Sequence, residues 1–179
     1  MKNLEKYRLK RDFFLNDVIE VAPALLGKVI VFKNQQLVIT ETEAYSGYDD
    51  PASHAFRGKT PRNEIMFGIG GFSYVYFIYG MYHCLNFVTG PAEQPSAVLI
   101  RGTYNLHDPS CHWNGPGKMC RAAGIDLTHT KIDIVTSEWF YVADTGITLP
   151  FHITPRVGIS RGQEMLRRFV ATQLPKKSC

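Results

Sequence analysis

Residues 74 to 88 read YVYFIYGMYHCLNFV, and this stretch predicts an exposed β-hairpin. Two apolar runs of strand character flank Tyr79-Gly80, a dipeptide suited to a tight turn because glycine adopts positive φ at little cost. The stretch also holds four of the nine tyrosines of the chain. A core strand would favour Val, Ile or Phe, because each buried phenol needs a hydrogen-bond partner. We therefore expect a half-exposed hairpin whose rings contact something planar.

The composition indicates one domain over residues 1–179, with 45% hydrophobic and 20% charged residues. No apolar stretch is long enough to span a bilayer, and the N-terminal segment lacks the apolar region of a signal peptide, so we expect a cytoplasmic protein with no membrane partner. The cysteines form no CxxC pair and match no zinc spacing, which predicts reduced thiols and no metal site. They are Cys84, Cys111, Cys120 and Cys179. The net charge of +4 is compatible with a polyanionic partner but does not establish one.

Hydrophobic patterning predicts an α+β fold: a single compact domain with a curved, mainly antiparallel sheet, few helices and a protruding β-hairpin. Asn16 is expected to cap a helix that runs to Gly27 with a kink at Pro23. A turn at Asn34-Gln35 is expected to join the first two strands. A short helix is expected over 118–123. Strands are expected over 28–33, 35–45, 74–78, 81–88, 96–102, 131–139 and 147–160.

The strand over 35–45 carries the first candidate for chemistry. Alternation places Glu41, Glu43 and Tyr45 on one face, immediately before a long loop over 46–72. A solvated strand face is the commoner explanation for such carboxylates. The alternative is that Glu43 acts as a general base or an electrostatic stabiliser at the end of the strand.

The loop over 46–72 carries the second candidate, because a loop of this length in a compact domain is usually functional or disordered. His54 and Phe56 stand among Arg57, Lys59 and Arg62. Basic residues interleaved with aromatic ones suit a phosphate backbone beside a stacking surface, although a solvated loop is the simpler explanation. The later NGPGK segment lacks the spacing of a Walker A loop, so we expect a turn before a helix there and no nucleotide cofactor.

Taken together, these segments resemble the alkyladenine (3-methyladenine) DNA glycosylase family. The matching segments occur in the family's order over about residues 25 to 160. They are LLGKVIV, ETEAYSGYDDPASHAFRGKTPRNEIMF, YVYFIYGMYHCLNFV, AVLIRG, NGPGKMCRAAGID and TPRVGIS. The second and third segments are highly specific to the family, whereas NGPGK alone would not be.

The resemblance implies a monofunctional enzyme that flips alkylated or deaminated purines out of duplex DNA and hydrolyses the N-glycosidic bond. Glu43 matches the catalytic glutamate that activates water, and Arg101 and the carbonyl of Val157 match groups that position this water. Extrusion is needed because a glycosidic bond inside stacked DNA cannot be reached. The resemblance also implies a monomer that uses no cofactor, partnered by double-stranded DNA with damaged purines and associated with the nucleoid of a bacterium.

The same resemblance assigns the residues that hold the base and the duplex. Tyr79 matches the residue that fills the gap left by the flipped nucleotide. The base pocket is expected to be formed by Tyr45, Ala52, His54, Tyr76 and Asn86. Further DNA contacts are expected from Arg57, Lys59, Thr60, Arg62, Met81 and Tyr82. Electron-rich tyrosine rings would attract an alkylated, cationic purine by roughly 0.5–2 kcal/mol per contact.

Two other classes of function remain open at this point. A catalytically silent nucleic-acid-binding module could share the same surface, but it would have no use for a carboxylate that faces a polyanion. A sugar-binding or glycoside-cleaving protein would need two carboxylates on opposite sides of one bond. Glu41 and Glu43 share a strand face and do not fit that requirement.

Overall fold

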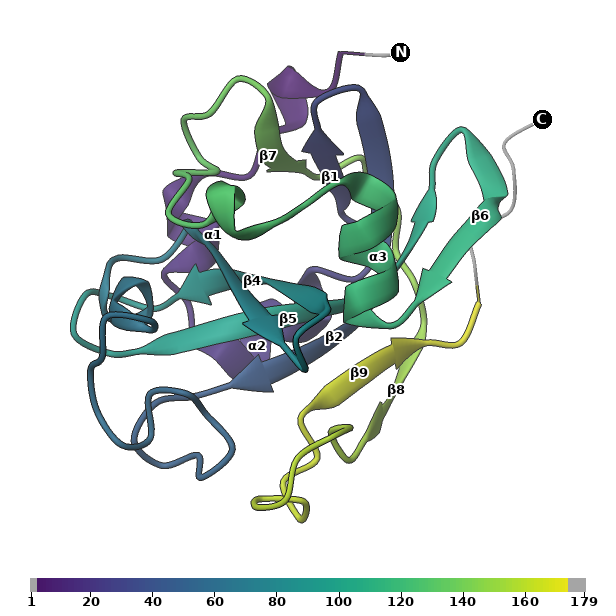
Figure 1. Cartoon of the computed structure of the whole chain (residues 1–179). Coiled ribbons are helices and arrows are strands. Elements are labelled where there is room, and N and C mark those ends of the chain that lie inside the picture. The colour runs from purple at the N-terminus through teal and green to yellow at the C-terminus, as the bar shows by residue number, and fades with distance from the viewer. Residues whose placement is uncertain (1–2, 174–179) are drawn as a thin grey trace.

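The computed structural model describes residues 3–173, and these residues are organised around one curled antiparallel sheet (Figure 1). The main path through the sheet runs β3-β4-β5-β2-β1-β7, with β6 paired to β5 and β9 paired to both β2 and β8. Every pair of neighbouring strands is antiparallel. The strands are β1 (Val29–Phe32), β2 (Gln35–Tyr45), β3 (Ser73–Ile78), β4 (Tyr82–Thr89), β5 (Ser96–Asn105), β6 (Asp108–Asn114), β7 (Phe140–Ala143), β8 (Phe151–Thr154) and β9 (Arg168–Ala171).

Helices are few and short, and the predicted α+β class is confirmed. The α-helices are α1 (Arg11–Phe14), α2 (Val18–Ala24) and α3 (Pro116–Ala123), and the 3₁₀ turns are η1 (Glu5–Tyr7), η2 (Glu64–Phe67) and η3 (Leu127–His129). Figure 1 shows α3, in green, beside β4 and β5, against which it packs. No helix among residues 3–173 combines the length and the apolar character needed to cross a membrane.

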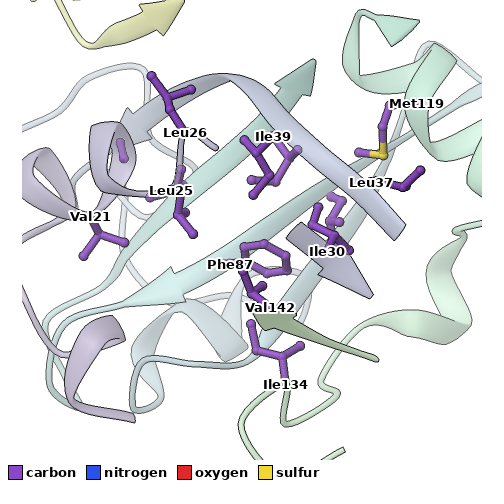
Figure 2. Packing of buried hydrophobic residues seen from close by; sticks show 14 of the residues in the cluster. Val21, Leu25, Leu26, Ile30, Leu37, Ile39, Phe87, Met119, Ile134 and Val142 are labelled. Carbon is purple, nitrogen blue, oxygen red and sulfur yellow. The ribbon is translucent and has the colours of Figure 1, made fainter. Parts of the chain in front are cut away.

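The main core lies where α2, α3 and the sheet meet. Figure 2 shows Leu25, Ile39 and Phe87 converging there, with Met119 reaching in from α3. All four side chains are buried. At ~1.5–3 kcal/mol for each large apolar side chain removed from water, this cluster fixes the sheet against its helices.

Helix α2 differs from the prediction in its N-cap residue. Asp17, and not Asn16, caps α2, because its carboxylate accepts from the N–H of Ile19 at 2.7 Å. The side chain of Asn16 instead donates to the carbonyls of Asp12 and Phe13, which closes the end of α1. Pro23 lies in the last turn of α2 and the helix ends at Ala24, so no helical segment remains beyond it to be kinked.

Three other local expectations were wrong. The strand expected over 147–160 is confined to β8. The first hairpin turns at Lys33 and Asn34, one residue earlier than predicted, with Lys33 at φ +52°. Residues 131–139 form turns, and the strand of this region is β7, which begins at Phe140. The turns form because Asp133 accepts from Arg11 at 2.6 Å and from the N–H of Val135 at 3.0 Å. Only Asp133 makes a strand-like bridge there, to Phe72.

The long strand β2 explains why its carboxylates are buried. Its first residues pair with β1, whereas Glu41 to Glu43 pair with β9, and β5 lies along the opposite edge. The strands β6 and β9 were absent from the prediction. Glu43 is fully buried and Glu41 nearly so, which excludes the solvated strand face considered above.

The predicted hairpin is confirmed, with a turn one residue longer than expected. Strand β3 ends at Ile78, β4 begins at Tyr82, and Tyr79, Gly80 and Met81 form the turn. Gly80 has the expected positive φ of +67°, and Tyr79 also has a positive φ, +54°. The tip projects into solvent, with Tyr79 76% and Met81 64% exposed.

Candidate active site

A cavity of about 410 Å³ opens between the β3–β4 hairpin, β5 and the N-terminal end of α3. This volume falls within the usual range for small-molecule sites, roughly 300–1,000 Å³. The loop that follows β2 and the turn at 157–159 complete the walls. Residues predicted for the site that line the cavity are Tyr45, Ala52, His54, Tyr76, Tyr79, Tyr82, Asn86, Arg101 and Val157. The structure therefore gathers, from distant segments, most of the residues that the sequence suggested.

Glu43 lies behind the cavity wall and is held by two hydrogen-bond donors and one ion pair. The N–H of Val157 donates to Oε1 at 2.8 Å, and the hydroxyl of Tyr45 donates to Oε2 at 2.7 Å. The Nε of Arg101 lies 3.5 Å from Oε1. Each carboxylate oxygen is thus oriented, which is what a general base needs if it is to meet a water molecule in one geometry.

The backbone of Val157 makes a contact that the sequence did not predict. Its N–H donates to the carboxylate of Glu43, whereas the resemblance assigns a role to its carbonyl. The side chain of Val157 is exposed and lines the cavity mouth. A residue whose backbone performs the task is hard to recognise from side-chain chemistry alone.

Burial raises the pKa of the Glu43 carboxyl above its ordinary value, although Arg101, the Val157 N–H and the Tyr45 hydroxyl all favour the ionised form.

A second carboxylate, Glu41, accepts from Arg101 at 3.0 Å and from Arg168 at 2.6 Å. Glu41 therefore orients Arg101 beside Glu43. Both carboxylates bind the same guanidinium, which does not fit a glycosidase site with one carboxylate on each side of a bond.

Aromatic rings form the cavity walls. The rings of His54 and Tyr76 meet edge to face with centroids 4.6 Å apart, and Nδ1 of His54 lies 2.9 Å from the hydroxyl of Tyr74. His54 is partly exposed at the mouth, yet the enclosure of its ring lowers its pKa to about 4, with a further contribution from Arg62. His54 is therefore neutral at physiological pH. Burial raises the pKa of the Tyr74 hydroxyl to about 12.

Two smaller residues complete the pocket. The amide nitrogen of Asn86 donates to the carbonyls of Tyr74 and Cys84 at 3.0 and 3.2 Å, which fixes the side chain inside the cavity. The N–H of Ala52 donates to Asp50 at 3.0 Å. The carbonyl of Ala52 is thus the backbone group that this residue can offer to a ligand.

The tip of the hairpin borders the cavity. Tyr79 and Tyr82 line it, whereas Met81 does not. Tyr82 packs on Gly117, where a Cβ atom would come within 2.6 Å of the tyrosine ring. The helix expected from Lys118 begins earlier, at Pro116, with Gly115 as its N-cap residue. Residues 115–118 also line the cavity, which the sequence did not indicate.

The Arg and Lys residues of the loop over 46–72 do not line the cavity. Arg57, Lys59 and Thr60 are exposed, and Lys59 lies over the ring of Phe67 at 5.6 Å. Thr60 forms a loop contact, since its N–H donates to Asn63 at 2.6 Å. Arg62 is tied to the hairpin, because Nη2 donates to the carbonyl of Phe77 at 3.1 Å.

Sequence reasoning missed a buried ion pair that supports the site. Nη1 of Arg156 donates to Oδ2 of Asp50 at 2.5 Å, and Nη2 donates to Oδ1 at 2.8 Å. Neither side chain is exposed. Arg156 also donates to the carbonyl of Ala44 at 3.0 Å and lies over the ring of Tyr45 at 4.6 Å. This pair connects the turn that carries Val157 to the strand that carries Glu43. Arg156 lies within the quoted TPRVGIS segment, but nothing local marks it as a buried residue.

An oriented carboxylate at the edge of an aromatic cavity, beside a projecting hairpin, defines an enzyme that receives a planar group and acts next to it. Residues 12–175 match the family model described as methylpurine-DNA glycosylase (MPG). The chain is 49% identical over 166 residues to a "Putative 3-methyladenine DNA glycosylase" of Rickettsia felis, covering 93% of this chain and 94% of that protein. It is 48% identical to the protein of the same description from Rickettsia rickettsii, covering 93% of this chain and 91% of that one.

The chain belongs to the methylpurine-DNA glycosylase family. It is accordingly an N-glycosylase, a hydrolase that acts in the base excision repair of alkylated bases, as the resemblance predicted.

Proposed function

We propose that this protein is a monofunctional enzyme that extrudes alkylated or deaminated purines from duplex DNA and hydrolyses the bond between base and sugar with a water molecule activated by Glu43. The observation that supports this best is the buried Glu43 carboxylate, held by two hydrogen bonds and the Arg101 ion pair behind the wall of the aromatic cavity. A nucleotide has to leave the duplex to reach such a site, at a cost of a few kcal/mol.

The extruded base would stack against the cavity rings. Tyr45 and Tyr76 offer electron-rich faces, and the neutral His54 completes the wall without adding a charge. Asn86 and the carbonyl of Ala52 would contact the edges of the purine. Damage that makes the base cationic strengthens the stacking, and damage that weakens pairing lowers the cost of extrusion.

Hydrolysis then requires little acid assistance, because an alkylated purine is already a good leaving group. The bond from the anomeric carbon to the base breaks, its electron pair departs with the base, and water adds to the carbon. Glu43 accepts the proton of that water, and its negative charge stabilises the oxocarbenium-like transition state. Arg101, fixed by Glu41, positions the water beside the carboxylate.

The hairpin would hold the duplex open. Tyr79, exposed at the tip, would fill the space of the lost base, with Met81 and Tyr82 beside it in the minor groove. Arg57, Lys59 and Thr60 would contact phosphates from the adjacent loop. We propose that the protein acts as a monomer without a cofactor.

Release of free base from alkylated duplex DNA tests this function. Glu43→Gln should lower the single-turnover rate by about 10²- to 10⁴-fold or more, because both base catalysis and the negative charge are lost. Binding to damaged DNA should persist. Glu20→Gln is a matched control on the exposed face of α2, outside the cavity, and should excise at the wild-type rate.

Three results would contradict the proposal. Near-normal rates in Glu43→Gln would remove Glu43 as the base. Binding without base release by the wild-type chain would favour the silent binding module. Cleavage of the DNA strand together with base release would indicate a covalent amine intermediate, for which Lys118 at the cavity mouth would be the candidate.

A further inference from the structure

Arg62 stands out among the basic residues of the loop over 46–72, because it lies against the cavity wall. Its guanidinium carbon lies 5.5 Å from the centre of the Tyr76 ring, and Nη2 donates to the carbonyl of Phe77. Tyr76 lines the cavity and Arg62 does not. The guanidinium therefore contacts the ring of a lining residue without itself lining the cavity.

The charge of Arg62 is not neutralised by a nearby carboxylate. Among residues 3–173 no Asp or Glu lies within ion-pair distance of it. The other stacking ring, Tyr45, also has a guanidinium over it, that of Arg156 at 4.6 Å, but Arg156 is paired with Asp50. Of the two guanidinium groups that lie over wall tyrosines, Arg62 is thus the one without a carboxylate partner among the described residues.

The positive charge of Arg62 already affects a residue of the cavity wall, His54. The positive charge of Arg62 contributes to the lowered pKa of His54, whose ring contacts Tyr76. A cation that disfavours a proton on His54 also disfavours a positive charge on a base stacked in the same cavity, because the two occupy neighbouring positions.

We infer that Arg62 is a specificity-determining residue that weakens the preference of the cavity for cationic purines over neutral ones. The inference rests on the proposed function. It assigns to Arg62 a task that does not require contact with DNA phosphates, in addition to the phosphate contact expected from the sequence.

Two like charges would then contact the same ring. A cationic base stacked roughly 3.5 Å from Tyr76 would lie at most about 9 Å from the guanidinium, whose carbon is 5.5 Å from the ring centre. At an effective dielectric constant between about 20 and 80, this repulsion reduces binding of the cationic base by roughly two- to twentyfold relative to a neutral base. A cationic purine is the better leaving group and tolerates such a loss, whereas a neutral damaged purine depends more on being held.

The test compares excision of 7-methylguanine, a cationic base, with excision of hypoxanthine, a neutral one, in duplexes of the same sequence. Arg62→Gln removes the charge but keeps an amide donor for the carbonyl of Phe77. The ratio of the two single-turnover rates should shift toward 7-methylguanine by about two- to twentyfold. Arg62→Lys should keep the wild-type ratio, because it keeps the charge.

Lys59→Gln is the matched control, since it removes one positive charge from the same loop but lies over Phe67 rather than Tyr76. It should weaken binding of both duplexes alike and leave the ratio unchanged. Dissociation constants of the same two duplexes, measured in the Glu43→Gln background, provide the same comparison without turnover.

An equal fall in both rates with Arg62→Gln would overturn the inference and leave Arg62 as a phosphate contact or a support of the hairpin. The same shift in Lys59→Gln would also overturn it, because the effect would then be one of net charge. Failure of the wild-type chain to release either base would instead contradict the proposed function, and the binding ratio would still decide the role of Arg62.

Discussion

The backbone N–H of Val157 donates to Oε1 of Glu43 across 2.8 Å, although the two residues are 114 positions apart in the chain. The contact exists because β9 pairs with β2 at Glu41 to Glu43, which brings the segment between β8 and β9 over the strand. The buried pair of Arg156 and Asp50 then fixes the turn beside Val157. The orientation of the catalytic candidate therefore depends on the last strand of the sheet.

The ionisation of Glu43 should make the folded chain less stable at higher pH. Because burial raises the pKa of Glu43, the folded state binds this proton more readily than the unfolded state, so stability is lost as the pH rises through the folded-state value. Glu43→Gln should therefore melt above the wild type at pH 8, by about 2–4 °C for each kcal/mol gained. Arg101 keeps its partner Glu41 in this variant.

Thermal melts of both proteins between pH 5 and pH 8 measure this difference. It should shrink on acidification, as Glu43 in the wild type takes up its proton. A variant that melts below the wild type at pH 8 would mean that the contacts of Glu43 with Val157, Tyr45 and Arg101 stabilise the carboxylate by more than its burial costs.

Binding to damaged DNA should depend strongly on salt, partly through Arg57, Lys59 and Arg62. Each phosphate contact contributes about 0.9 to the slope of log affinity against log salt concentration, so the triple alanine variant should have a slope lower by up to about 2.7. Titrations by fluorescence anisotropy at several salt concentrations measure it. Lys33→Ala, at the turn between β1 and β2, is a control for loss of charge outside the cavity. An unchanged slope in the triple variant would remove this loop from the interface.

Replacing Tyr79 by Ser should weaken the complex with the flipped nucleotide by ~1–3 kcal/mol, the usual contribution of one aromatic stack. The fold should not suffer, because the side chain is 76% exposed. Fluorescence of 2-aminopurine placed beside the lesion reports the flipping. Tyr48→Ser, at another exposed tyrosine that does not line the cavity, should flip like the wild type. If Tyr79→Ser also flips normally, the neighbouring Met81 or Tyr82 fills the gap.

A chelator should leave base release unchanged. The proposed reaction needs only a carboxylate, a water molecule and a good leaving group, and residues 3–173 hold no cluster of three His, Cys, Asp or Glu side chains suited to a metal ion. Single-turnover rates in EDTA, with and without added zinc or magnesium, measure this. Loss of activity that either metal restores would contradict the mechanism.

Local patterns were enough to predict the parts of the site that belong to one segment. Alternation along β2 placed Glu41, Glu43 and Tyr45 on one face, and all three lie in the same network of contacts. The turn at Tyr79-Gly80 followed from glycine and its flanking apolar runs. The thiols of Cys84, Cys111 and Cys120 are unpaired, and Cys179 lies outside the described residues. These features depend on neighbours within a few positions, which a sequence displays directly.

Tertiary structure alone decided which distant groups meet. No local pattern indicates that the Val157 N–H reaches Glu43, that Arg156 is buried on Asp50, or that Arg62 lies over the ring of Tyr76. The strand predicted over 131–139 is also wrong, because the carboxylate of Asp133 binds Arg11 and the chain forms turns there. Each of these contacts depends on the register of strands far apart in the chain and on the curl of the sheet, and neither is encoded in any single segment.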